Sequence, residues 1–255
     1  MVNLRPNLTP ASLVKPISPN GWRLEIPAGP AGRYRLAQLD DYAALPRRSF
    51  PWKPPYHLDT RLRASAPDLP GTWGFGLWND PFILSLGLGG GSRRFPALPN
   101  AAWFFYASSH NYLSFRDDLP ARGFLAATFA SPVVPASLLA LGSLALPGFL
   151  VPLLSQLLRR IVRQFVRQDA RLVAIDPTVW HTYGLDWQAS QVTLTVDGEP
   201  VLETRVSPRP PLGLVFWIDN QYAALPPSGG LRYGFLASPE PAWIEILLDN
   251  PIATS

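Results

Sequence analysis

The frequency of chain-breaking residues most constrains what this sequence can fold into. Thirty prolines and 19 glycines are spread along all 255 residues without a repeat period. Proline lacks a backbone N–H and clashes within a helix, and glycine favours turns. Long helical bundles and coiled coils are therefore excluded, and many short strands joined by turns are favoured. Because all-β domains often reach roughly 250 residues, we expect residues 1–255 to form a single domain.

Alternation of apolar and polar residues supports an all-β chain. The clearest signal is the Asp197-Gly198 pair between two alternating runs, which is typical of a type I′ hairpin because both central residues need positive φ. The number of strands predicts a two-sheet antiparallel β-sandwich or jelly roll. The expected strands are Trp22–Ile26, Tyr34–Leu39, His57–Ala66, Trp73–Asn79, Trp103–Tyr106, Tyr112–Arg116, Phe124–Phe129, Trp180–Trp187, Val192–Val196, Val201–Val206, Leu212–Ile218, Leu231–Phe235 and Trp243–Leu248.

Glycines alternate with large side chains in the stretch from Trp73 to Asn79. A glycine in a strand lets another backbone, an aromatic ring or a ligand approach that face closely. The face that carries these glycines can therefore be approached closely.

Composition excludes several classes of site. The chain has no cysteine, so it forms no disulfide and has no thiolate nucleophile or Cys-ligated zinc. The three histidines, His57, His110 and His181, lack the spacing of metal ligands. We expect no metal and no cofactor. Hydrophobic residues make up 47% of the chain, which is enough for a sizeable core.

The charge pattern bears on partners and location. The net charge is only +4, and four arginines between Arg159 and Arg167 supply much of it, so we expect no nucleic-acid partner. The first residues lack the basic and apolar regions of a secretory signal. We therefore expect a cytoplasmic protein, with a peripheral membrane location as the alternative.

One segment breaks the strand pattern, and we expect residues 131–168 to form a helical insertion. No charged residue occurs from Gly123 to Leu158, and Val151 to Val166 places apolar residues at helical spacing opposite the arginines. Leu138 to Leu158 is long enough to span a membrane. A single crossing would separate strands that must pair in one sandwich, so a span is not expected.

Three interpretations of this insertion stay open. The one we favour is a helix packed on the sandwich with its arginines in water. The second is an interfacial helix on an anionic membrane, and the third is a lid over an apolar ligand. The residues expected to act in the membrane or lid roles are Leu154, Leu158, Arg159, Arg160, Arg163 and Arg167.

Three stretches resemble a known family. Arg61–Ala66 followed by Leu69–Trp78 resembles the strand-turn-strand of family 16 glycoside hydrolases, which are laminarinase-like enzymes. Trp180–Val201 resembles the family's paired strands and Asp-Gly hairpin, and Trp243–Asp249 resembles its closing strand. The resemblance spans roughly Trp52 to Asp249, with the apolar segment as an insertion. It implies a concanavalin A-like jelly roll.

The catalytic signature of that family is missing. The family carries Glu-x-Asp-x-x-Glu on a strand between these matches, because retaining glycosidases need two carboxyl groups about 5 Å apart. This chain has Ala101–Ser108 there, and no Asp or Glu occurs from Pro81 through Arg116. We therefore expect the fold without the glycoside hydrolase activity.

The resemblance implies a ligand site on the concave face, where the family holds its sugar chain. Aromatic rings with a few amides and one carboxylate suit a carbohydrate or another flat apolar ligand. Any single ring is still favoured to be core. The expected ligand-binding residues are Trp73, Trp78, Asn79, Trp103, Tyr106, Asn111, Tyr112, Trp217, Asp219 and Asn220.

These observations lead to two functional hypotheses. The first is non-hydrolytic binding of a glycan or glycoconjugate in a concave aromatic cleft. The alternative is an enzyme of another class with a lidded cleft for a lipid, terpenoid or polyketide-like substrate, or a membrane-surface protein. In the enzyme, Tyr106, His110 or Asp219 would do acid–base work. The sequence does not determine the oligomeric state.

Overall fold

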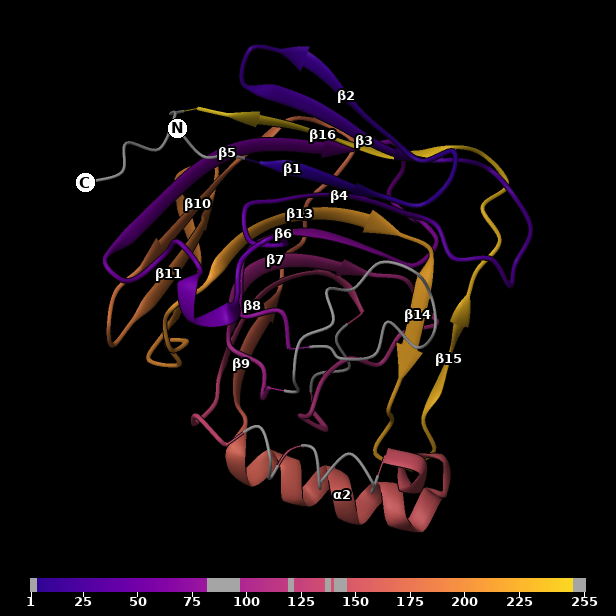
Figure 1. The fold of residues 1–255 in the computed structure, drawn as a ribbon, viewed down its shortest axis with the longest axis vertical. Helices are drawn as coiled ribbons and strands as arrows, with labels where there is room; N and C mark the ends of the chain where they lie inside the picture. Colours follow the sequence, from indigo (N-terminus) through magenta and orange to yellow (C-terminus); the bar gives the residue numbers. More distant parts are fainter. Residues whose placement is uncertain (1–3, 82–96, 119–121, 136–138, 140–145, 250–255) are drawn as a thin grey trace.

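The computed structural model describes residues 4–81, 97–118, 122–135, 139 and 146–249. Two seven-stranded antiparallel sheets pack against each other as a sandwich (Figure 1). In spatial order, the inner sheet consists of β1 (Arg5–Leu8), β4 (Leu36–Asp40), β13 (Gly213–Asp219), β6 (Thr72–Trp78), β7 (Ala101–Ala107), β8 (Gly123–Ala130) and β9 (Arg167–Leu172). The all-β prediction is confirmed.

The outer sheet also has seven strands. In spatial order these are β12 (Glu199–Thr204), β11 (Val192–Val196), β10 (His181–Trp187), β5 (Tyr56–Ala64), β16 (Ala242–Leu248), β3 (Gly21–Ile26) and β2 (Leu13–Ser18). A separate hairpin of β14 (Gln221–Ala224) and β15 (Arg232–Phe235) extends beyond the sandwich toward the helix (Figure 1). Two short 3₁₀ helices, η1 (Arg47–Ser49) and η2 (Leu146–Leu150), lie in connections.

Local sequence explains the best-predicted strands. Along β5, buried residues alternate with more exposed ones from end to end, as expected for a strand with one wet face. Asp197 and Gly198 have φ values of 51° and 84°, so the β11–β12 hairpin has the positive φ at both turn residues that the sequence predicted.

The main core lies between the two sheets. Trp73, Phe75, Phe104 and Tyr183 are at most 1% exposed, and their rings pack within one aromatic and aliphatic cluster. Phe75 stacks on Phe104 at 5.3 Å between ring centroids and meets Tyr183 edge-on at 5.1 Å. Burying rings of this size supplies much of the sandwich's hydrophobic stabilisation.

The predicted strand at Tyr112–Arg116 is wrong. Only Tyr112 pairs there, through an isolated bridge to Ala224. The segment is held by side chains instead, since the Gln168 amide oxygen accepts hydrogen bonds from the Phe115 N–H (2.9 Å) and the Ser114 hydroxyl (3.2 Å). Four short strands, β1, β2, β9 and β14, were not predicted because their sequences are polar or interrupted by proline.

Helix α2 (Pro152–Phe165) confirms the helical part of the predicted insertion. Proline is tolerated at its first position because the N–H there has no helical partner. Arg167 lies in β9, not on the helix, and residues 136–138 and 140–145 of the insertion lie outside the described residues. In the part of the chain that the structure covers, no helix is long and apolar enough to cross a membrane.

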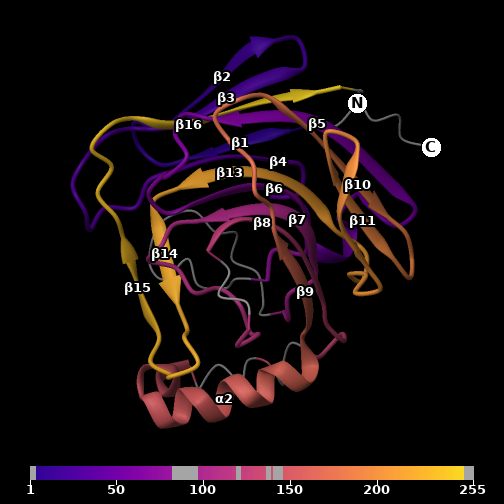
Figure 2. The same ribbon diagram turned by 180° about the vertical axis from the view of Figure 1, so that it is seen from behind.

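The prediction that the arginines form the wet side of this helix holds for Arg160 and Arg163, which are exposed, and is wrong for Arg159. Arg159 is only 3% exposed, whereas Leu157 is 52% exposed and Ile161 is 43% exposed. Figures 1 and 2 show α2 spanning the open side of the inner sheet, from β9 to the tip of the β14–β15 hairpin. There the Leu231 N–H donates to the Phe149 carbonyl (2.7 Å) and the Gln156 side chain donates to the Ser228 carbonyl (3.0 Å).

Candidate functional site

The concave face of the inner sheet is the face that looks toward α2, and strand alternation decides which side chains lie on it. In β6, Trp73, Phe75 and Leu77 belong to the core, so Gly74, Gly76 and Trp78 lie on the concave face. Trp217 of β13 pairs with Gly74, and Trp103 of β7 pairs with Gly76. The pairing therefore puts three tryptophans on one face of adjacent strands.

The two glycines make room for these rings. A Cβ atom on Gly74 would lie 2.6 Å from the Trp217 ring, and one on Gly76 would lie 2.7 Å from the Trp103 Cβ. Both distances are far inside van der Waals contact. Gly76 also has a φ of 145°, which disfavours other residues. The close approach that the glycines allow is made by the Trp217 ring at Gly74 and by Trp103 at Gly76.

Trp78, Trp103 and Trp217 form what we name the tryptophan cluster. Trp217 lies 6.4 Å from Trp78 in a stacked arrangement and 5.5 Å from Trp103 in a tilted one, between ring centroids. Trp78 and Trp103 are 5.9 Å apart. All three side chains are partly exposed. The ring edges and faces are therefore within reach of a small ligand.

The rest of the concave face around β7 and β8 is covered. Phe105 and Phe129 are each 8% exposed, and Leu125 is 1% exposed. Leu113 packs on the Phe105 side of this surface, and Phe115 packs on the Phe129 side together with Val162 of α2. The tryptophan cluster is thus the accessible part of a face that is otherwise largely closed by the chain.

A polar network borders the cluster at the end of β13. The Trp217 indole N–H donates to the Thr72 hydroxyl (3.0 Å), which donates in turn to Oδ1 of Asp219 (2.8 Å). Oδ1 also accepts the backbone N–H groups of Thr72 and Gln221, both at 3.2 Å, and Oδ2 accepts the Tyr34 hydroxyl at 3.5 Å. The Thr72 hydroxyl therefore links the Asp219 carboxyl group to the Trp217 ring of the cluster.

The environment of Asp219 favours its protonated form. Burial raises the pKa of Asp219 to about 7, and the hydrogen bonds from Thr72, Gln221 and Tyr34 only partly oppose that effect. Burial, together with the nearby Asp219 charge, also raises the pKa of Tyr34 well above its usual value. A carboxyl group with a pKa near 7 holds or releases a proton at neutral pH.

Two predicted site residues do not lie on the concave face. Trp73 and Tyr106 both belong to the core between the sheets, where their rings stack at 5.6 Å, and Trp73 is 0% exposed. Burial raises the pKa of Tyr106 to about 12. The expectations that these two residues line the cleft, and that Tyr106 acts as an acid or base there, are wrong because strand alternation turns them inward.

The three predicted asparagines serve the backbone. Asn79 accepts the Asn100 N–H (2.9 Å) and donates to the Leu98 carbonyl (2.8 Å). Asn220 accepts the Arg35 N–H (2.8 Å), and its amide donates to two carbonyls. Asn111 is 0% exposed, accepts the Ala223 N–H (3.0 Å) and donates to the Ser108 hydroxyl (3.0 Å). Their polar groups secure strand ends, which the sequence pattern does not distinguish from a ligand site.

Tyr112 and His110 lie apart from the tryptophan cluster. The Tyr112 ring is 8% exposed and lies 5.5 Å from the Arg159 guanidinium, while its hydroxyl points to the backbone carbonyls of Arg116 and Asp117. His110 is exposed in a turn, with its ring 6.0 Å from that of Tyr222. The expected set thus reduces to Trp78, Trp103, Trp217 and Asp219.

Several residues of the site were missed. Phe105 lies two positions after Trp103, so period-two alternation was enough to place it on the same face. Thr72 and Tyr34 lie far from Asp219 in sequence, and no local pattern joins them. They become neighbours only because β13 pairs with both β6 and β4.

The distribution of carboxylates limits the chemistry. The chain has 18 acidic residues, and all of them lie within the described residues. Strands β6, β7 and β8 carry none. Asp40 shares the concave face with Asp219 but pairs with Val215, four residues away, which is about 13 Å along the strand. Among the described residues no group of three or more His, Asp or Glu is placed to hold a metal ion.

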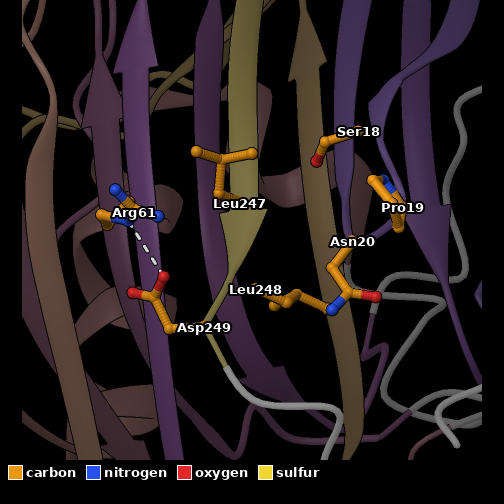
Figure 3. A pocket seen from close by; sticks show the side chains of 7 residues that line it. All are labelled: Ser18, Pro19, Asn20, Arg61, Leu247, Leu248 and Asp249. Atoms are coloured by element: carbon orange, nitrogen blue, oxygen red, sulfur yellow. Dashed lines mark hydrogen bonds and ion pairs between the residues drawn. The ribbon is translucent and has the colours of Figure 1, made fainter.

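A small hollow lies on another part of the molecule, beside the outer sheet. It has a volume of about 280 Å³ and lies between the β2–β3 turn and strands β5 and β16 (Figure 3). Its two charged side chains, Arg61 and Asp249, are paired with each other at 2.9 Å. None of the predicted site residues lines it.

Comparison with known proteins gives similarity at the level of solved structures. No protein-family model and no curated protein matches the chain. A glycoside hydrolase family protein from Mycobacterium thermorestibile is 12% identical, with 89% of this chain and 73% of that chain covered and a TM-score of 0.45. The solved structures that this chain resembles are glycoside hydrolases and a transglycosylase.

Some of these similar structures are complexes with sugars. LamA from Z. galactanivorans, in complex with laminaritriose and laminaritetraose, is 12% identical over 95% of this chain and 89% of that one, with a TM-score of 0.44. The kappa-carrageenase from Pseudoalteromonas carrageenovora, in complex with an oligotetrasaccharide, is 13% identical over 94% and 80%, with a TM-score of 0.43. Because the sequence identities and TM-scores are this low, no activity of these proteins can be transferred to this chain. The evidence for the sandwich is the strand pairing within this structure.

Proposed function

We propose that the tryptophan cluster binds a glycan without hydrolysing it. The observation that carries this proposal is the grouping of three partly exposed indole rings beside the hydroxyl and carboxyl groups of Thr72 and Asp219. Aromatic faces pack against the C–H faces of sugar rings, and nearby polar groups fix their orientation.

The covering of the concave face limits the length of this glycan. Segment 113–115 and helix α2 close the β7–β8 half of the surface, so a long chain cannot lie across all the strands. Figure 2 shows α2 and the β14–β15 hairpin enclosing the open side. The site therefore suits one or a few sugar units, or the end of a longer chain.

The carboxylates support binding without hydrolysis. A retaining glycosidase needs two carboxyl groups about 5 Å apart, and an inverting one needs them within about 10 Å. Asp219 has no second carboxyl group on β6, β7 or β8, and Asp40 is about 13 Å away along the strand. Asp219 alone can donate or accept a hydrogen bond to a sugar hydroxyl.

A glycan array followed by titration calorimetry tests the proposal. Laminaritriose and laminaritetraose belong among the probes because one of the similar structures binds them. We expect Trp103→Ala and Trp217→Ala each to weaken binding at least tenfold. Trp180→Ala serves as the control, since Trp180 is partly exposed and packs on Arg63 of the outer sheet. Equal affinities in all four proteins, or no glycan bound, would rule the site out.

The apolar lining favours a second candidate function, the binding of a hydrophobic small molecule. The indole rings of Trp78, Trp103 and Trp217 offer an apolar surface, and a protonated Asp219 would donate a hydrogen bond or act as an acid. Native mass spectrometry of the purified chain, followed by denaturing extraction, distinguishes the two. A bound apolar metabolite would favour this candidate, and an empty protein that binds a glycan would exclude it.

A further inference from the structure

Helix α2 is oriented the opposite way to an ordinary surface helix. A helix packed on a globular protein buries its apolar stripe and exposes its charged residues. Here Ser155 is 0% exposed and Arg159 is 3% exposed, whereas Leu153 is 80% exposed. Ser155 and Arg159 face the protein, whereas Arg160, Arg163 and most of the apolar side are exposed.

The inward orientation is fixed by Arg159. Its guanidinium donates to the carbonyls of Ser114 and Leu225, both at 2.7 Å, and to that of Arg116 at 3.1 Å. It also binds Asp117 at 3.0 Å. Because these acceptors come from two separate loops, the helix cannot turn over to bury its leucines without breaking a buried charged network.

The outward side carries a continuous apolar surface, which we name the apolar stripe. The seven residues of the stripe are half of all the exposed large hydrophobic residues in the described part of the chain. Such concentration differs from the scattered apolar residues of an ordinary surface. The stripe consists of Leu150, Val151, Leu153, Leu154, Leu157, Ile161 and Phe165.

The segment that carries the stripe contains basic residues and no acidic ones. No acidic residue occurs from Gly123 through Gln168. Arg160, Arg167 and Arg171 are exposed, and none of them forms an ion pair with another residue of the described part. Asp117 is paired with Arg159 and Arg163, and Asp169, which lies between Arg167 and Arg171 in β9, is paired with Arg116. An apolar strip beside unpaired arginines is complementary to a surface that is apolar within and anionic at its boundary.

We propose that α2 lies on the surface of an anionic lipid bilayer. The apolar stripe would enter the boundary between headgroups and acyl chains, and the arginines would contact lipid phosphates. The 14-residue helix is about 21 Å long and would lie in the plane of the membrane. In both views α2 is the outermost element on its side of the molecule, so no sheet obstructs the contact (Figures 1 and 2). This inference is independent of the proposed ligand.

Flotation of the full chain with vesicles tests the proposal. We expect at least tenfold more protein to float with vesicles of phosphatidylcholine and phosphatidylserine than with phosphatidylcholine alone. For the variant L157Q/I161Q, we expect the amount of protein that floats with the phosphatidylserine vesicles to fall at least tenfold. The variant R160Q/R167Q should float equally with both kinds of vesicle. The matched control is L13Q/I17Q, which changes two residues of similar exposure on β2 of the outer sheet and should float like the wild type.

The same proteins give the outcomes that would overturn the proposal. All variants change exposed side chains, and circular dichroism with thermal melting verifies that they fold. Absence of flotation in the wild type contradicts the proposal, as does flotation that L157Q/I161Q leaves unchanged. If sedimentation equilibrium shows a dimer that this variant dissociates, and nothing floats, a second copy of the chain covers the stripe instead.

Discussion

At the scale of single residues, Asp219 gives the protein a pH dependence opposite to that of most acidic residues. Burial raises its folded-state pKa to about 7, whereas an unfolded aspartate titrates near pH 4, roughly. Between these values the folded protein binds more protons than the unfolded chain. The contribution of Asp219 to the free energy of unfolding therefore falls as the pH rises through this window.

We predict that Asp219→Asn removes this dependence. Asparagine keeps an oxygen for the hydrogen bonds from Thr72 and Gln221, so the fold should be retained. From pH 5 to 8 the wild type should lose roughly 2–4 kcal/mol of stability relative to the variant. Denaturant unfolding across this range measures the difference. Burial also raises the pKa of Asp41 to about 6, but Asp41 is present in both proteins and its effect cancels. Parallel stability curves would contradict the raised pKa.

A second prediction at this scale concerns Gly74. A Cβ at this position would lie 2.6 Å from the Trp217 ring and 2.5 Å from the Phe104 carbonyl oxygen, so both would have to move. Gly74→Ala should cost about 1–3 kcal/mol of stability, as overpacking does. It should also shift the tryptophan emission. Unchanged emission and stability would mean that the Trp217 ring does not lie flat on β6.

Single residues also show how far sequence reasoning reaches. The sequence predicted Trp103, Trp217 and Tyr106 together on the concave face. Trp103 and Trp217 lie there, but Tyr106, three positions after Trp103, lies on the opposite face because of strand alternation. Thr72 and Tyr34 were beyond prediction, because their approach to Asp219 depends on which strands become neighbours. The raised pKa of Asp219 follows from that burial and not from any local motif.

At the scale of elements, the position of α2 followed from its periodicity but its orientation did not. Amphipathicity identifies two faces, and tertiary contacts decide which one is buried. The decisive contacts come from Ser114, Asp117 and Leu225, which lie at least 40 residues away in sequence. The strand at Tyr112–Arg116 failed for a similar reason, since Gln168 supplies the hydrogen bonds that a neighbouring strand would have made.

We predict that Arg159 holds α2 in place. Arg159→Ala leaves the carbonyls of Ser114 and Leu225 without their charged donor, and it should cost about 2–4 kcal/mol of stability. Arg160→Ala is the matched control because that side chain is exposed, and it should change stability by at most about 0.5 kcal/mol. Hydrogen exchange should quicken in α2 and in residues 113–117 of the Arg159 variant alone. Equal effects of the two substitutions would show that the network does not anchor the helix.

At the scale of the whole molecule, the two-sheet sandwich could be predicted because most strands carry their own alternation and turn residues, whereas the order of the strands within each sheet was not predicted. The closure of the concave side could not be predicted from the sequence. It depends on hydrogen bonds that join the β14–β15 hairpin to α2 through Gln156 and to η2 through Leu231. This closure separates the molecule into a ligand-facing interior and an outward apolar helix. We therefore propose glycan binding on the concave side and membrane contact on the outward side of α2.

Saturation-transfer difference NMR on a mixture of the protein and the oligosaccharide selected on the array tests glycan binding most directly. Saturating the aromatic protons should transfer signal to the C–H protons of one or a few sugar units. The transfer should vanish in the double variant W103A/W217A and persist in Trp180→Ala, with the oligosaccharide intact after prolonged incubation. Absence of transfer, transfer that the double variant retains, or cleavage of the oligosaccharide would contradict binding without hydrolysis at the tryptophan cluster.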